Sequence, residues 1–244
     1  MNLIWAIGAS VVVSLISLIG VFGLFMKEKA LNSILILLVG ISGGALMGGA
    51  FFHLVPEALE KSSSESVFLF LIIGFIVFFI MERYLHWRHC HQEHCEIHPF
   101  SYMNLVGDGV HNFVDGLIIG ASFVIDVKFG LITTAAIVLH EIPQEIGDFG
   151  VLVYGGMKKG KALFYNFLSA ATAIVGSFIG YYFSETLSSF LFFMLPFAAG
   201  GFIYVACCDL VPEIHKQADI KRANLSVIFF IIGILLVLLV KTLH

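Results

Sequence analysis

Charge is scarce in this sequence. Asp, Glu, Lys and Arg make up 12% of its 244 residues, whereas soluble domains carry about a quarter. Hydrophobic residues make up 59%, and the mean hydropathy is +0.99. Runs of about 20 apolar residues, the length that crosses a bilayer, recur along almost the whole chain. These features exclude a soluble domain and predict an all-α polytopic membrane protein that contacts the lipid bilayer and has no nucleic-acid partner.

Cysteine is also scarce. The four cysteines, at positions 90, 95, 207 and 208, do not form a disulfide framework. No basic residue precedes the first apolar run, and the first lysine, Lys27, follows it. A cleaved signal peptide has the opposite order, so residues 3–25 are predicted to remain as the first membrane helix.

Polar breaks divide the chain into eight apolar segments, which we interpret as one transmembrane domain over residues 1–244. The predicted helices lie at about 3–25, 31–58, 66–86, 99–125, 129–155, 160–183, 187–214 and 224–243. Of the 13 lysines and arginines, all but Lys61, Lys128 and Lys241 fall in connections on one side. Cytoplasmic loops are enriched in basic residues, so we predict that both termini lie outside the cytoplasm and the loop at 86–98 inside. The small size favours a prokaryotic cytoplasmic membrane.

A faint internal repeat links the second and seventh segments. "GGALMGGAFFHLVPEALEK" and "AAGGFIYVACCDLVPEIHK" both place a glycine-rich stretch before "LVPE". Under the predicted topology the two copies cross the membrane in opposite directions. This pattern is typical of an inverted repeat and predicts a 3+2+3 arrangement, with three helices on either side of a central pair. Alternatively, proline and glutamate simply end two unrelated helices.

The two central segments carry the polar residues. Residues three and four apart share a helix face, which gives one stripe in each segment. The stripes are Asn104, Asp108, His111, Asn112 and Asp115 in the fourth segment, and His140, Glu141, Gln144, Glu145 and Asp148 in the fifth. One carboxylate at mid-bilayer costs about 2.5–3.5 kcal/mol, and neither stripe holds a lysine or arginine. We therefore expect a metal ion or protons to supply the missing positive charge, although buried polar residues that only join helices are the alternative.

The ligand types in the stripes indicate which cation would bind. His111 with Asp115, and His140 with Gln144, have the i, i+4 spacing that lets two side chains hold one ion. Imidazole, carboxylate and amide oxygen together suit Zn²⁺, Fe²⁺ or Mn²⁺.

"HNFVDG" followed by "HEIPQEIGD" closely resembles the paired signatures of the ZIP (Zrt/Irt-like) divalent-metal transporters. The nearest branch reads HEIPHEIGD in the fifth helix, and "FFHLVPEAL" in the second segment resembles that branch as well. The resemblance spans nearly the whole chain. It implies uptake of Zn²⁺, or of Fe²⁺, Mn²⁺ or Cd²⁺, toward the cytoplasm by a homodimer, with helices one, four, five and six moving against the rest. No catalytic cofactor is expected.

The resemblance also implies a binuclear metal centre between the fourth and fifth helices. Its ligands would be His111, Asn112, Asp115, His140, Glu141 and Gln144. Met47 is expected to line the approach, and Asn166 stands where some relatives place an acid. Gln144 departs from the branch, which usually has histidine there, so the metal preference of the second site is left open.

Further residues are candidates for accessory roles. Asp108, Glu145 and Asp148 extend the polar stripes along the pathway. His53 and Glu57 either collect metal at the outer end of the second helix or cap that helix. Asp209 would lie along the inner exit.

The connection after the third segment is rich in potential ligands, namely His86, His89, Cys90, His91, His94, Cys95 and His98. Their spacing fits no fixed tetrahedral site, so we interpret this loop as a loose cytosolic metal binder, with a solvated linker as the alternative. The strongest rival function is an intramembrane zinc hydrolase, because "HEIP" opens like H-E-x-x-H. Gln144 occupies the place of the second histidine and so removes a ligand from that motif.

Overall fold

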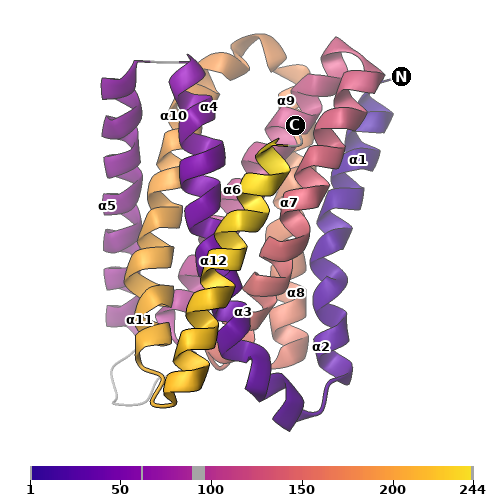
Figure 1. Cartoon of the computed structure of the whole chain (residues 1–244). Coiled ribbons are helices and arrows are strands. Elements are labelled where there is room, and N and C mark those ends of the chain that lie inside the picture. The colour runs from indigo at the N-terminus through magenta and orange to yellow at the C-terminus, as the bar shows by residue number, and fades with distance from the viewer. Residues whose placement is uncertain (1, 62, 90–96, 243–244) are drawn as a thin grey trace.

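A computed structural model describes residues 2–61, 63–89 and 97–242. Within these ranges the chain forms helices joined by short connections, with no strand. The helices lie side by side as long rods (Figure 1). The elements in chain order are α1 (Asn2–Ile16), η1 (Ser17–Gly20), α2 (Val21–Phe25), α3 (Glu28–Gly48), η2 (Gly49–Leu54), α4 (Val55–Lys61), α5 (Ser64–His89), α6 (Pro99–Ile125), α7 (Val127–Tyr154), α8 (Lys159–Ala170), α9 (Thr172–Tyr182), α10 (Ser184–Tyr204), η3 (Val205–Leu210), α11 (Val211–His215) and α12 (Ile220–Thr242).

Seven of the described helical segments are long and apolar enough to cross a membrane. The chain is therefore a multi-pass integral membrane protein. Each of the seven coincides with a predicted apolar segment, and the remaining predicted segment is α7. That helix is equally long, but His140, Glu141, Glu145 and Asp148 lower its hydropathy. The count of eight membrane crossings therefore stays a prediction.

The helix of the third predicted segment, α5, is longer than predicted. α5 continues past position 86 to His89, because no proline or glycine between Gly74 and Pro99 stops the helix. Cys90, His91, His94 and Cys95 of the predicted metal-binding loop lie outside the described residues. His98 is described, and its backbone N–H donates to Gly155 O at 2.9 Å while its ring stacks on Phe100.

The two copies of the internal repeat share an unusual local structure. η2 and η3 are both π-helical turns of six residues, and each directly precedes Val-Pro-Glu. Pro56 and Pro212 supply no amide proton and crowd the carbonyl four residues earlier, so a wider π turn at both places has one physical cause. α4 and α11, which follow these turns, lie at opposite ends of the bundle (Figure 1).

Both copies also pack on a neighbouring helix in the same way. A Cβ on Gly44 of α3 would collide with the Phe230 carbonyl oxygen of α12, and a Cβ on Gly200 of α10 would collide with the Leu71 carbonyl oxygen of α5. Gly44 and Gly200 occupy the same position relative to Val-Pro-Glu. This match supports the inverted repeat, while the full 3+2+3 arrangement stays a prediction.

For description we divide the helices into two groups, each with close glycine contacts inside it. The first group consists of the helices in the contacts just described, namely α3, α5, α10 and α12. In the second group, which holds α1 and α6 to α9, Gly116 of α6 meets the Ala173 carbonyl of α9, and Gly180 of α9 meets the Leu117 carbonyl of α6. Between the groups α3 packs on α7, where Gly147 faces the Ser42 side chain. The glycines thus serve close packing both within each group and between the groups.

Candidate metal centre

The polar stripes of α6 and α7 face each other because the two helices form an antiparallel pair with a tight connection. Asp126 ends α6 in an extended conformation, and its Oδ1 accepts a hydrogen bond from Phe129 N at 2.8 Å, which caps α7. α7 therefore runs back along α6, and its residues near 140 lie beside those near 111.

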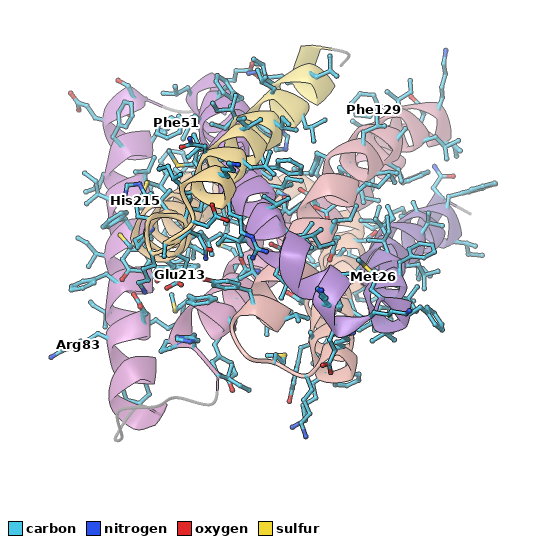
Figure 2. All side chains as sticks on the ribbon, turned by 60° about the horizontal axis from the view of Figure 1, so that its bottom comes forward. Met26, Phe51, Arg83, Phe129, Glu213 and His215 are labelled. Atoms are coloured by element: carbon cyan, nitrogen blue, oxygen red, sulfur yellow. The ribbon has the colours of Figure 1, made fainter. Side chains whose placement is uncertain are left out.

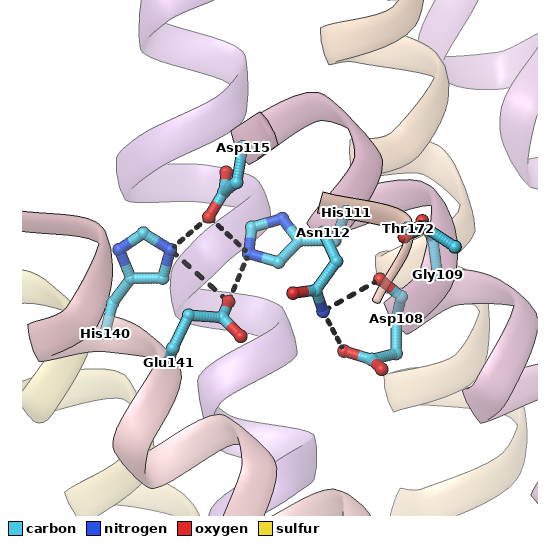
Figure 3. Close-up of polar contacts among 8 residues, drawn as sticks. All are labelled: Asp108, Gly109, His111, Asn112, Asp115, His140, Glu141 and Thr172. Atoms are coloured by element: carbon cyan, nitrogen blue, oxygen red, sulfur yellow. Dashed lines mark hydrogen bonds and ion pairs between the residues drawn. The ribbon is translucent and has the colours of Figure 1, made fainter. Parts of the chain in front are cut away.

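Four side chains converge there (Figure 3). His140 Nε2 lies 3.0 Å from Asp115 Oδ2 and 3.6 Å from Glu141 Oε1. His111 Nε2 lies 3.3 Å from Glu141 Oε1 and 3.7 Å from Asp115 Oδ2. One ligand atom of each residue lies within 4.8 Å of the other three, and all four residues are buried. We call these residues the histidine centre.

The spacing of these donors suits a tetrahedral cation. With metal–ligand bonds of about 2.0–2.2 Å, the ligand atoms of a tetrahedral zinc site lie about 3.3–3.6 Å apart. The separations of 3.0–3.7 Å around the histidine centre bracket that value. Two imidazole nitrogens and two carboxylate oxygens are also ligand types that Zn²⁺ accepts.

Unsatisfied polar atoms at the histidine centre also indicate a bound cation. Both ring nitrogens of His111, both carboxylate oxygens of Glu141 and Oδ1 of Asp115 are buried without a hydrogen-bond partner. Burial without a partner costs about 1–3 kcal/mol for a polar group, and more for a charged one. A bound cation would compensate several of these atoms at once.

A cavity of about 600 Å³ leads to the histidine centre. His111, Asp115 and His140 line its inner part together with Gln144, and Glu57, Glu60, Phe129 and Lys241 lie at the other end. These last residues belong to the end of α4, the start of α7 and the end of α12, at the upper end of the bundle in Figure 1. His53 also lines the cavity, and its ring centre lies 5.3 Å from that of His140.

Most of the remaining predicted residues of the stripes pair with neighbours, whereas Gln144 lines the cavity. Asn112 donates through Nδ2 to Asp108 Oδ1 at 2.9 Å, which leaves Asn112 Oδ1 unpartnered. Asn166 of α8 donates to Glu145 Oε2. Asp148 Oδ1 accepts a hydrogen bond from Ser42 Oγ of α3 at 2.9 Å. Gln144 is buried and its Nε2 lacks a partner.

Two predicted accessory residues lie elsewhere in the described structure. Cys207 Sγ lies 3.8 Å from Met47 Sδ, and Met47 is not among the described residues that line the cavity. Asp209, on η3, is buried near Glu82 and Glu213. Figure 2 shows this end of the bundle, where Glu213 and His215 of α11 lie and Arg83 points away from the helices.

Sequence reasoning missed two contacts that shape the site. The ring of Phe202 lies 5.0 Å from that of His111, and Ser42 holds Asp148. Both residues come from helices whose local pattern is apolar, so no short motif identifies them.

Comparison with known proteins gives consistent matches. The family model described as ZIP Zinc transporter matches residues 3–99 and 87–241. Zinc transporter ZIP13 of Pongo abelii is 31% identical over 83% of this chain and 65% of its own length. Zinc transporter zipt-7.1 of Caenorhabditis briggsae is 29% identical, with 88% and 71% covered. Zinc transporter SLC39A7 of Homo sapiens is 27% identical, with 98% and 71% covered.

Proposed function

This chain belongs to the ZIP zinc transporter family, and from that membership we propose that it carries a divalent metal ion, with zinc as the preferred cargo, through a centre between α6 and α7. Members of the family are zinc transporters and not enzymes, so the intramembrane hydrolase is not retained. Fe²⁺, Mn²⁺ and Cd²⁺ are further candidate cargoes on ligand chemistry.

The single observation that carries the proposal is the histidine centre at the inner part of the cavity. Four buried ligands of the types that bind Zn²⁺ converge there, and a cavity of about 600 Å³ connects them to one end of the bundle. A structural set of polar contacts between helices needs no such access.

The same cavity, combined with the charge pattern, supports uptake toward the cytoplasm as the direction of transport. The cavity reaches the end of the bundle where α4 ends and α7 begins, and the positive-inside rule places that end outside the cytoplasm. On the opposite side of the centre, the Asp148–Ser42 hydrogen bond ties α7 to α3. Metal would therefore enter from outside and leave inward after the two helix groups shift against each other.

A second ion beside the first would make the centre binuclear. Asn112 Oδ1, Asp115 Oδ1 and Glu141 Oε2 are buried and unpartnered, and Gln144 lies at the same level of the cavity. We assign these oxygens, together with the amide oxygen of Gln144, to the second ion.

Two further proposals concern assembly and the 86–98 connection. The family resemblance supports a homodimer, and the histidines and cysteines of the connection support loose metal binding in the cytosol.

Uptake into proteoliposomes tests the proposed function. The purified full chain should take up Zn²⁺ along a gradient, and His111→Ala should stop that uptake. His215→Ala is a matched control, because His215 is exposed on α11 and outside the cavity. Equal uptake by the parent, the His111 variant and protein-free liposomes would refute transport.

A further inference from the structure

A second group of polar side chains lies deeper in the bundle than the histidine centre. It consists of Ser42 on α3, Asn104 and Asp108 on α6, and Asp148 on α7, and we call it the inner oxygen cluster. Asp108 precedes His111 by about one helical turn and Asn104 by about two, and Asp148 follows Glu141 by about two. The cluster therefore lies on the side of the histidine centre that faces away from the cavity.

One hydrogen bond and the electrostatic neighbours of the two acids link the four side chains. Ser42 Oγ donates to Asp148 Oδ1 at 2.9 Å, and the Asn104 amide lies next to Asp148. Asp108 and Asp148 lie close enough to repel each other electrostatically. Asn104 and Asp108 are four residues apart and share one face of α6.

The cluster is buried and incompletely satisfied. All four residues are at most 3% exposed. Oδ2 of Asp108, Oδ2 of Asp148 and Oδ1 of Asn104 lack hydrogen-bond partners. A neutral amide has no charge that could compensate the acids. A fully buried amide oxygen without a partner is unusual in a folded protein, and it points to a ligand beside Asp148.

α3, α6 and α7 offer the two carboxylates no lysine or arginine in their membrane-embedded parts, and the ionisable nitrogen that faces them is that of His111, which belongs to the histidine centre. Residues 30–60 contain no lysine or arginine, and residues 99–154 contain only Lys128, at the start of α7. Two buried carboxylates without a cation are strongly unfavourable. A bound cation would therefore compensate the cluster.

We propose that the inner oxygen cluster is a separate binding position for a divalent cation, used by the cargo after it leaves the histidine centre. This inference depends on the proposed function for its place in the pathway. Its ligands are all oxygens, a donor set that suits hard cations such as Mn²⁺. The two imidazoles of the histidine centre have the opposite preference. The chain thus offers its cargo a nitrogen-containing site first and an all-oxygen site second.

The position also bridges the two helix groups. Ser42 belongs to α3, whereas the other three residues belong to α6 and α7. Gly147 lets the helices approach closely here, since a Cβ at that position would lie 2.7 Å from Ser42 Cβ. When the groups shift, the cluster loses the Ser42 hydroxyl, and the cation is held less tightly.

Equilibrium binding of Mn²⁺ to the purified full chain in detergent tests the proposal. The background carries Asp115→Ala and Glu141→Ala together with His111→Ala and His140→Ala, which removes the histidine centre and the acids assigned to the second ion. We expect this quadruple variant to retain one class of Mn²⁺ site, and Asp148→Asn in that background to weaken it at least 10-fold. Asp219→Asn is the control for removal of a carboxylate, because Asp219 is exposed at the start of α12. Unchanged Mn²⁺ binding after Asp148→Asn would overturn the proposal.

Asn104→Ala leaves the charge of the cluster unchanged. It replaces Asp148→Asn as the test variant if Asp148→Asn does not fold. It should weaken Mn²⁺ binding several-fold, and unchanged binding would again overturn the inner position. Transport is measured separately, as Zn²⁺ uptake by the parent in proteoliposomes. If the parent takes up no Zn²⁺ but its Mn²⁺ binding still depends on Asp148, the transport function is refuted and the inner site stands. If the parent takes up Zn²⁺ but Mn²⁺ binding does not depend on Asp148, only the inner site is refuted.

Discussion

His140 Nε2 of α7 lies 3.0 Å from Asp115 Oδ2 of α6, and both residues are buried. This contact joins the two central helices at the point where the cavity ends. It also marks the level at which the two polar stripes meet. Glu141, the next residue on α7, thereby comes within reach of His111 on α6.

Loss of one ligand of the histidine centre should abolish transport. His140→Ala and Asp115→Ala each leave three ligands around a site that needs four, so affinity for Zn²⁺ should fall by more than about 100-fold, the upper range for a change in a supporting residue. The measurement is Zn²⁺ uptake together with surface expression. Near-normal uptake by the two variants would rule out the centre as the transport site.

Gln144 should tune metal preference. Gln144→His adds an imidazole beside His140 and should shift uptake toward Zn²⁺ over Mn²⁺, because Zn²⁺ binds imidazole better than amide oxygen. Gln144→Glu should tighten binding of both ions and slow their release, and Gln144→Ala should keep partial transport. Apparent affinity and maximal rate for the two metals distinguish these cases. If all three variants match the parent, Gln144 does not contact the metal.

The topology is open to chemical labelling. Gly160 lies in the first turn of α8, where a Cβ meets nothing within 4 Å, and Ser63 is exposed between α4 and α5. Cysteine at Ser63 should react with an impermeant reagent from outside, and cysteine at Gly160 only after permeabilisation. These labels are compared in a background without the native cysteines. The opposite pattern would reverse the orientation and favour export.

The glycine contacts of the two repeat copies should be equally intolerant of a side chain. Gly44→Ala and Gly200→Ala each force a Cβ against a backbone carbonyl oxygen. Such overpacking costs about 1–3 kcal/mol, so each variant should unfold at a clearly lower temperature than the parent in detergent. Gly8→Ala is the matched control, because a Cβ there meets nothing within 4 Å. A normal melting temperature for either variant would show that the helices can separate at that contact without loss of stability.

The 86–98 connection should modify transport without carrying the metal. Replacement of its histidines and cysteines by serine should leave Zn²⁺ uptake within about twofold of the parent, since the histidine centre lies in α6 and α7. Complete loss of uptake at normal expression would move the connection into the conduction pathway.

Part of the site was determined by the sequence alone. Apolar runs separated by polar breaks predicted the membrane-spanning helices, because a bilayer admits few backbone conformations other than helices. The i, i+4 spacing placed His111 with Asp115 on one face of α6, and "HEIPQEIGD" placed His140 and Glu141 on α7, since these relations depend only on helix periodicity.

The tertiary structure decided which of those side chains meet. Four residues of the stripes form the histidine centre, whereas Asn112 turns its amide nitrogen to Asp108 and Glu145 pairs with Asn166. Ser42 and Phe202 enter the site from helices that are distant in sequence. Helix periodicity gives the face of a residue but neither the height nor the rotation of the helix against its neighbours. Those are set by the cap at Asp126 and by close backbone contacts at glycines such as Gly116 and Gly147, which depend on packing between segments far apart in the chain.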